Sequence, residues 1–243
     1  MKTGKIAGRA LMMALVIGFG LAAPLTVFGQ KTATEFYNKG TAHMDKEEWD
    51  LAIKAFTKAI DKDPKFADAY FNRGLCHKNK EEWDEAISDY SKVLELNPKD
   101  YQAYNNRGNA YREKGALDQS IKDYSKAIEI NPKYPLAYHN RAVAYRKQEK
   151  FDLSIKDSTK AIELDPKESD FYFSRALCYS MKKSWDLAIK DYTKAIELDP
   201  KDATCYYNRG LAYLRKGDKA KSKADYDKAV ALDPDLANDP YEN

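Results

Sequence analysis

Six prolines stand at equal intervals along the chain, and no other feature constrains its architecture as strongly. They lie 34 residues apart, each directly after Asp or Asn: Pro64, Pro98, Pro132, Pro166, Pro200 and Pro234. Proline cannot continue a helix and disfavours helical geometry in the residue before it. A fixed period of this length is the signature of a repeat architecture. We therefore expect six helical units: 33–66, 67–100, 101–134, 135–168, 169–202 and 203–236.

The apolar residues inside each unit have helical spacing. In the third unit, for example, Tyr104, Gly108 and Tyr111 occupy positions four, eight and eleven. Offsets of four, three and seven place them on one face of a helix. After a polar break near position fifteen, a second apolar series begins with Leu117 and continues through Ile121. Each unit is therefore predicted to be a helix–turn–helix.

These positions together resemble the tetratricopeptide repeat family. The period, the aromatic residues at four and eleven, the Gly or Ala at eight, the small residue at twenty-seven and the Pro at thirty-two all match over residues 33–236. The resemblance implies an all-α fold, a right-handed α-solenoid of six repeats. Its first helices would line a concave groove. Residues 237–243 would form a C-terminal tail.

The N-terminal 29 residues have the layout of a secretory signal. A basic start is followed by an uncharged apolar run over 10–23, and Val27 and Gly29 are small enough for cleavage before Gln30. The run is short for a spanning helix, which needs roughly 20 residues. We expect an exported protein, periplasmic or secreted, with no membrane span after cleavage. An uncleaved N-terminal anchor is the alternative.

The charge balance argues against a nucleic-acid partner. The chain has 41 basic and 38 acidic residues, and residues 1–29 hold three of the basic ones and no acidic one. The remaining chain is therefore neutral, whereas a nucleic-acid binder normally carries a basic domain. The three cysteines, Cys76, Cys178 and Cys205, have neither disulfide-framework nor zinc-site spacing. We expect them to be small buried residues, with a Cys178–Cys205 bridge as the alternative, and we expect no metal or cofactor.

An arginine at position seven and an aspartate at position twenty-three recur together. Units two to six carry both, whereas unit one has Lys39 and Ala55 instead. We infer a pairing between first and second helices, within a unit or across the joint to a neighbour; ligand binding by these arginines is the less favoured alternative. In the last unit, Lys219 and Lys223 replace apolar residues, which gives the polar outer face of a self-capping terminal repeat. Some apolar surface remains there, so a homodimer stays open.

An asparagine recurs at position six, on the concave face that the resemblance implies. The series is Asn38, Asn72, Asn106, Asn140 and Asn208. A primary amide both donates and accepts hydrogen bonds, so a ladder of amides can hold the backbone of an extended peptide. Bonds between the helices themselves are the equally weighted alternative.

Two neighbouring positions complete the predicted groove. Position five offers aromatic anchors, namely Tyr37, Phe71, His139, Phe173 and Tyr207. Position twelve offers a positive stripe of Lys78, Arg112 and Arg146, suited to an acidic side chain or a free carboxylate. A solvated charged rim is the alternative for this stripe.

No catalytic motif is present, so we expect no enzyme. The sequence predicts a protein–protein interaction scaffold or adaptor that binds a peptide segment of a partner in its groove, in bacterial envelope assembly. A self-associating scaffold that uses the convex face or the array ends is the alternative. An enzyme or enzyme subunit is the rival class, with His139 as its one candidate residue.

Overall fold

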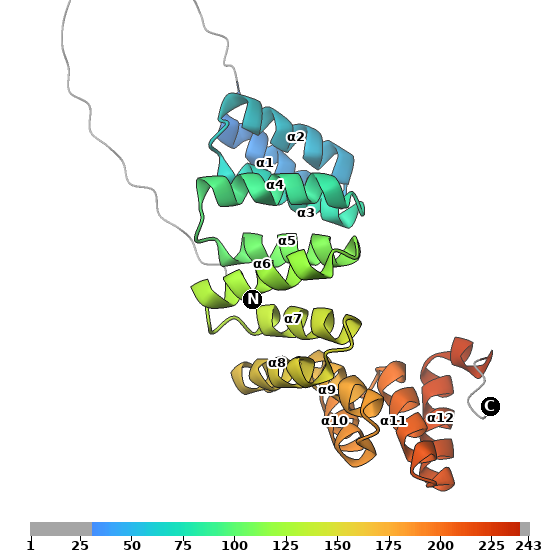
Figure 1. The fold of residues 1–243 in the computed structure, drawn as a ribbon. Coiled ribbons are helices and arrows are strands. Elements are labelled where there is room, and N and C mark those ends of the chain that lie inside the picture. Colours follow the sequence, from blue (N-terminus) through green and yellow to red (C-terminus); the bar gives the residue numbers. More distant parts are fainter. Residues whose placement is uncertain (1–30, 239–243) are drawn as a thin grey trace, which may run out of the picture. The chain divides into compact units, whose positions relative to one another are not determined.

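The computed structural model describes residues 31–238, which form twelve α-helices and a short C-terminal 3-10 helix (Figure 1). The α-helices are α1 (Ala33–Met44), α2 (Trp49–Lys62), α3 (Ala67–Asn79), α4 (Trp83–Leu96), α5 (Tyr101–Glu113), α6 (Leu117–Ile130), α7 (Pro135–Lys147), α8 (Phe151–Leu164), α9 (Ser169–Met181), α10 (Trp185–Leu198), α11 (Ala203–Arg215) and α12 (Lys219–Leu232), and η1 spans Pro234–Asn238. The six predicted helix pairs and the all-α class are confirmed.

The helices belong to one compact unit, Thr32–Asn243, which has its own buried core. The predicted secretory signal falls on residues 1–29, outside the described residues. Within the described range 31–238, no helix has the length and apolar character needed to cross a membrane.

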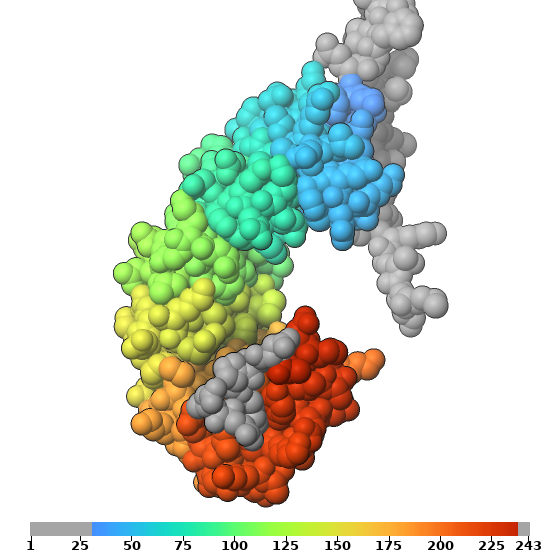
Figure 2. Space-filling model, turned by 90° about the vertical axis from the view of Figure 1, so that its right-hand side faces the viewer, coloured from blue at the N-terminus to red at the C-terminus, as the bar shows by residue number. Residues whose placement is uncertain are grey.

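The pairs stack in chain order along this unit (Figure 2). Each helix packs most closely on its partner in the pair and next most closely on the following pair. First helices of neighbouring repeats also touch each other, as α5 does α7 and α7 does α9, whereas no two second helices make a comparable contact. The first helices therefore lie on the inner side of the stack, as the family resemblance implies.

Local signals set the ends of the helices. Thr32 and Glu35 form a reciprocal capping box at the start of α1. Asp100 caps α5 by accepting hydrogen bonds from two backbone N–H groups, and Pro135 occupies the first turn of α7, where no N–H is needed. Each second helix ends two residues before one of the periodic prolines.

The turn inside every repeat places position fifteen in the left-handed region. Gly115 and Gly217 have φ of 77° and 85°, and the same position in the other repeats has φ of 57° to 60°. The non-glycine residues there are Glu47, Glu81, Glu149 and Lys183. A left-handed conformation costs an L-residue roughly 1–2 kcal/mol. Four of the six turns are therefore strained.

A ring at position twenty-four packs against the small residue at position eight. A Cβ added to Gly108 would lie 2.7 Å from the Tyr124 ring, and one added to Gly74 would lie 2.9 Å from that of Tyr90. In these repeats glycine leaves room for the ring, whereas repeat five has Ala176 opposite Tyr192. The fourth repeat departs from the pattern, because it has Ala142 at position eight and Ser158 at position twenty-four.

The arginine–aspartate pairing joins three helices. Arg73 donates from Nε and Nη2 to Asp89 at 2.8 and 2.7 Å, and from Nη1 to the Thr57 hydroxyl of the preceding repeat at 3.0 Å. Arg107, Arg141, Arg175 and Arg209 make the same three bonds. The structural interpretation is confirmed, and the arginine serves both alternatives at once: an ion pair within the repeat and a hydrogen bond across the joint.

The three cysteines are buried and free. The alternative of a Cys178–Cys205 bridge is therefore wrong. Burial raises the pKa of the Cys76 thiol to about 12, and it also raises that of Cys178. Unreactive thiols of this kind pack as small apolar residues.

The sixth repeat ends under the 3-10 helix. Helix η1 packs on α12, and the Tyr226 hydroxyl donates to the Leu236 carbonyl at 3.4 Å. Lys219 and Lys223 lie exposed on the outer side of α12. The chain itself thus covers some of the apolar surface at this end. That surface was the reason for considering a homodimer.

Candidate binding groove of the first helices

Two of the position-six amides bridge neighbouring repeats. Asn72 donates from Nδ2 to the Tyr37 hydroxyl at 2.9 Å, and Asn140 donates to Asn105 Oδ1 at 2.9 Å. Each acceptor is the position-five residue of the preceding repeat. These two asparagines therefore form hydrogen bonds between helices, which was the alternative to peptide binding.

The amide behaves differently where the preceding position five is phenylalanine. Asn106 follows Phe71, and its half-buried amide has no hydrogen-bond partner within residues 31–238. Asn208 follows Phe173 and turns back to donate to the Thr204 carbonyl at 2.8 Å. Asn38 belongs to the first repeat and is exposed, and its amide has no partner among the described residues. The ladder is therefore divided: Asn38 and Asn106 offer free amides, and Asn72 and Asn140 do not.

The position-five side chains are half-buried and pack on the ring at position twenty-four of their own repeat. The ring centroids of Phe71 and Tyr90 are 5.7 Å apart, and those of Phe173 and Tyr192 are 5.9 Å apart. Tyr37 and Tyr207 make the same contact with Phe56 and Tyr226. These rings are packed within their own repeats and do not project freely from the first helices. Burial raises the pKa of Tyr37.

The position-twelve cations are half-buried as well. Arg112 donates to Glu113 Oε1 at 2.9 Å and to Asn140 Oδ1 at 3.4 Å. The Nε of Arg146 is buried and has no hydrogen-bond partner, and Lys78 has no ion-pair partner in the described chain. The three side chains of this stripe are therefore partly removed from solvent, unlike those of a fully solvated rim.

His139, the enzyme candidate, is packed against Phe171 with ring centroids 5.0 Å apart. Burial lowers its pKa to about 4, and the charges of Arg112 and Arg146 lower it further against the opposing effect of Asp170. The imidazole is therefore neutral at pH 7. Its buried Nδ1 bonds neither a nucleophile nor an acid, and no group of three or more potential metal ligands exists in residues 31–238.

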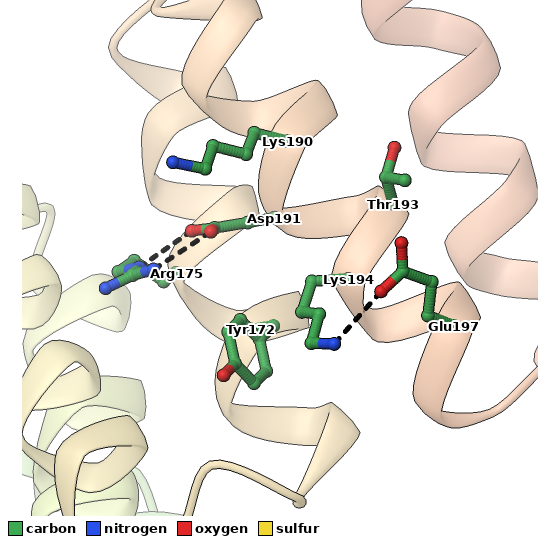
Figure 3. A pocket seen from close by; sticks show the side chains of 7 residues that line it. All are labelled: Tyr172, Arg175, Lys190, Asp191, Thr193, Lys194 and Glu197. Carbon is green, nitrogen blue, oxygen red and sulfur yellow. Dashed lines mark hydrogen bonds and ion pairs between the residues drawn. The ribbon is translucent and has the colours of Figure 1, made fainter.

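A second kind of concavity lies beside the second helices. In the fifth repeat, a recess of about 440 Å³ lies between α9 and α10 (Figure 3). It is lined by Tyr172, Arg175, Lys190, Asp191, Thr193, Lys194 and Glu197. Arg175 is paired with Asp191 and Lys194 with Glu197, whereas Lys190 has no ion-pair partner among the described residues. An equivalent recess of about 460 Å³ exists in the fourth repeat.

The same place in the first repeat is altered. Its recess is lined by Phe36, Lys39, His43, Leu51, Lys54, Ala55 and Lys58. The arginine–aspartate pair is absent there, so three lysines surround the Phe36 ring, and Lys58 lies 5.7 Å above its centroid. Sequence reasoning did not identify these recesses, although the lysine at position twenty-six recurs in all six repeats.

Family models match the chain throughout the array. A model described as TPR repeat matches 40–81, 108–149 and 179–217, and models described as tetratricopeptide repeat match 67–100, 135–168 and 203–236, and 90–122 and 159–190. A comparison with curated protein sequences gave no match.

Three solved structures illustrate the likeness. YrrB, described as a TPR protein with an unusual peptide-binding site, is 27% identical with a TM-score of 0.61, over 76% of this chain and 96% of its own. MamA is 25% identical with a TM-score of 0.62, over 71% and 94%. A tetratricopeptide repeat protein from Parabacteroides merdae shares the fold at 21% identity, with a TM-score of 0.71 over 86% and 87%. The likeness to YrrB and MamA supports a protein–protein interaction scaffold, and the chain belongs to the tetratricopeptide repeat family.

Proposed function

We propose that this protein is a non-catalytic adaptor that binds an extended peptide segment of a partner protein along its first helices. One observation carries the proposal: the amide of Asn106 is half-buried on the inner side of the stack and lacks a partner in the described chain. Its side-chain atoms are not among the fully buried unpaired ones, so a ligand can reach them. A peptide backbone supplies both the donor and the acceptor that a primary amide needs.

The surroundings of Asn106 suit such a segment. Phe71 of the preceding repeat and Leu75 are half-buried, so they offer apolar surface beside the amide. Asn109 and Asn140 are already bonded, to Tyr124 and Asn105 respectively, which fixes the polar wall around it. YrrB, a relative that shares the fold, is described as having an unusual peptide-binding site, which is consistent with this assignment.

The test is a capture experiment with two matched variants. Residues 30–243 would be crosslinked in an envelope extract, beside Asn38→Ala/Asn106→Ala, which removes the free amides, and Asn208→Ala, whose amide bonds its own helix. We expect the captured partner to be lost with the double variant and retained with Asn208→Ala. Equal capture by all three proteins would move the interface away from the groove.

Export to a bacterial envelope is part of the same proposal and rests on residues 1–29 alone. N-terminal sequencing of the mature protein tests it. A start at Gln30 supports a cleaved signal, and a start at Met1 in a membrane fraction supports the anchor alternative.

Self-association is the second candidate, favoured by one observation. Leu51, Leu153 and Leu187 occupy the same position on second helices and are 49%, 45% and 47% exposed. A concentration-dependent mass by sedimentation, abolished by Leu153→Ser/Leu187→Ser, would support this scaffold role. A constant monomer mass would leave the leucines as isolated surface residues.

A further inference from the structure

The recess of repeat one differs in charge from the equivalent recesses of repeats four and five. Its lining includes three lysines, Lys39, Lys54 and Lys58, and no carboxylate. The recess of repeat five is also lined by three cations, but Asp191 and Glu197 accompany them. The recess of repeat four has the same balance as that of repeat five. The positive charge of repeat one is therefore not offset inside its recess.

Two substitutions in repeat one account for the missing carboxylates. At position twenty-three, repeats two to six have the aspartate that pairs with arginine, whereas repeat one has Ala55, which is 4% exposed. At position twenty-nine, repeats two to five have a glutamate that forms an ion pair of 2.6 to 3.0 Å with the lysine at position twenty-six. Repeat one has Asp61 there, which is one methylene shorter and forms no ion pair with Lys58 among the described residues.

The three lysine amines have no hydrogen-bond or ion-pair partner within residues 31–238. Lys39 occupies the position of the arginine that, in repeat two, bonds both its own aspartate and the preceding repeat. His43 also lines the recess, but its Nδ1 already lies 2.5 Å from Glu48 Oε2. Lysine is charged at pH 7, so the recess contains three cations without a counter-charge.

The geometry brings these amines around one apolar surface. Lys39 comes from α1, and Lys54 and Lys58 stand four residues apart on α2, hence on one face of that helix. The Lys58 amine lies 5.7 Å above the centre of the Phe36 ring. The recess encloses about 210 Å³, which leaves room for a small oxyanion with several waters, since one water occupies about 30 Å³. All three lysines are exposed, so a ligand from solution can reach them.

The number and kind of these donors suit a phosphate group. Like charges gathered in one recess repel each other, so an anion is favoured there. A phosphate ester carries a charge of about −1.5 to −2 at pH 7 and has three strong acceptor oxygens. Lysine binds phosphate as a point charge, without the paired geometry that arginine imposes. A carboxylate has a single charge and two oxygens, and it would leave one amine unsatisfied.

We propose that the recess of repeat one binds a phosphate group, with Lys39, Lys54 and Lys58 each donating to one of its oxygens. This site goes beyond the proposed function, because it lies between the two helices of repeat one and uses positions seven, twenty-two and twenty-six. The phosphate belongs either to a free phosphate or to the headgroup of an anionic lipid. Leu51 also lines the recess and is 49% exposed, so it would enter the bilayer in the second case.

The test has one arm for each source and uses residues 30–243. In the first arm, inorganic phosphate is titrated at constant ionic strength while the NMR signals of the lysine side chains are followed. We expect the signals of Lys39, Lys54 and Lys58 to shift and saturate with phosphate and not with acetate. In the second arm, the protein is sedimented with vesicles of phosphatidylcholine and phosphatidylglycerol, or of phosphatidylcholine alone. Binding to the mixed vesicles without a response to inorganic phosphate identifies the lipid headgroup.

Variants make the assignment specific. Lys54→Gln should weaken binding about two- to threefold, as expected for the loss of one exposed ion pair. The matched control is Lys156→Gln, at the same position in repeat four, where Asp157 and Glu163 offset the charge, and it should change nothing. Leu51→Ser should weaken vesicle binding and leave the response to inorganic phosphate unchanged.

The double variant Lys39→Arg/Ala55→Asp restores the arginine–aspartate pair that repeats two to six contain. It should abolish the saturable shifts at Lys54 and Lys58, because the new carboxylate supplies the missing negative charge. Circular dichroism should show unchanged helicity. If the double variant bound phosphate as tightly as the original protein, the missing aspartate would have no part in the site.

Two further results would overturn the site. One is the absence of a saturable response in both arms, and the other is an equal effect of Lys54→Gln and Lys156→Gln, which would indicate attraction by net charge alone. In each case the capture experiment with Asn38→Ala/Asn106→Ala still decides the proposed function separately, because neither asparagine lines the recess.

Discussion

The guanidinium of Arg141 binds the carboxylate of Asp157 through two parallel hydrogen bonds of 2.7 and 2.9 Å, and its third nitrogen donates to Ser125 of the preceding repeat at 2.9 Å. Asp157 is 5% exposed. Five such arginines connect the first helix, its own second helix and the second helix before it. The repeats are therefore joined by a regular polar contact in addition to apolar packing.

Arg141→Leu is predicted to lower the free energy of unfolding by about 3 kcal/mol, because it leaves the buried Asp157 without a counter-charge. Urea denaturation followed by circular dichroism measures the loss. The double variant Arg141→Leu/Asp157→Leu should recover most of it, since replacing a buried pair by apolar residues is often neutral. A double variant that loses the sum of the two single effects would show that the two side chains are not energetically coupled, which would contradict this account.

Glu149→Gly is predicted to stabilise the protein, because Glu149 has φ of 58° and glycine adopts this region without strain. The gain expected is about 0.5–1 kcal/mol after the entropy that glycine loses on folding. The matched control is Gly217→Ala, which should cost a similar amount because φ is 85° there. Both are measured by thermal unfolding, and a loss of stability in Glu149→Gly would contradict the account of the turn.

Gly108→Ala is predicted to destabilise the protein by about 1–3 kcal/mol, since its new Cβ would lie 2.7 Å from the Tyr124 ring and overpack the repeat. In repeat four, position twenty-four is Ser158, and Ala142→Gly should cost the difference in helix propensity, about 1 kcal/mol. Chemical denaturation compares the two. Equal costs would show that the ring does not demand glycine.

His139 is predicted to make the stability of the protein depend on pH. Its pKa is lowered to about 4 in the folded chain, below the unfolded value of about 6.5. The unfolded chain therefore binds the proton first as pH falls, so stability is lost between about pH 6.5 and 4, by up to about 3 kcal/mol. His139→Phe, which places the residue of repeats two and five there, should remove this slope. Parallel pH profiles of the two proteins would contradict the prediction.

Much of the fold was predictable because its signals are local or periodic. The prolines mark the helix ends, and the joint absence of arginine and aspartate in repeat one, at Lys39 and Ala55, revealed their pairing. The left-handed turn was not predictable at Glu81 or Lys183. Both residues have a Cβ, which disfavours positive φ, and the packing of the repeats imposes this conformation on them.

The candidate site was predictable only in part. The asparagines at position six are alike in sequence, and they differ in structure because the preceding repeat presents either an acceptor, as Tyr37 does, or a ring, as Phe71 does. The state of each asparagine therefore depends on a residue of the preceding repeat. Comparing only the residues at position six does not reveal it. The buried, unpartnered Nε of Arg146 likewise follows from packing between helices.

Site-specific photo-crosslinking tests the central claim most directly. A photoreactive amino acid would replace Leu75, which is half-buried on the first helix α3, or Leu187, which is 47% exposed on α10, and each protein would be irradiated in an envelope extract. The account predicts a discrete adduct from position 75, lost on adding Asn38→Ala/Asn106→Ala, and none from position 187. An adduct from position 187 alone would contradict groove binding and place the partner on the second helices.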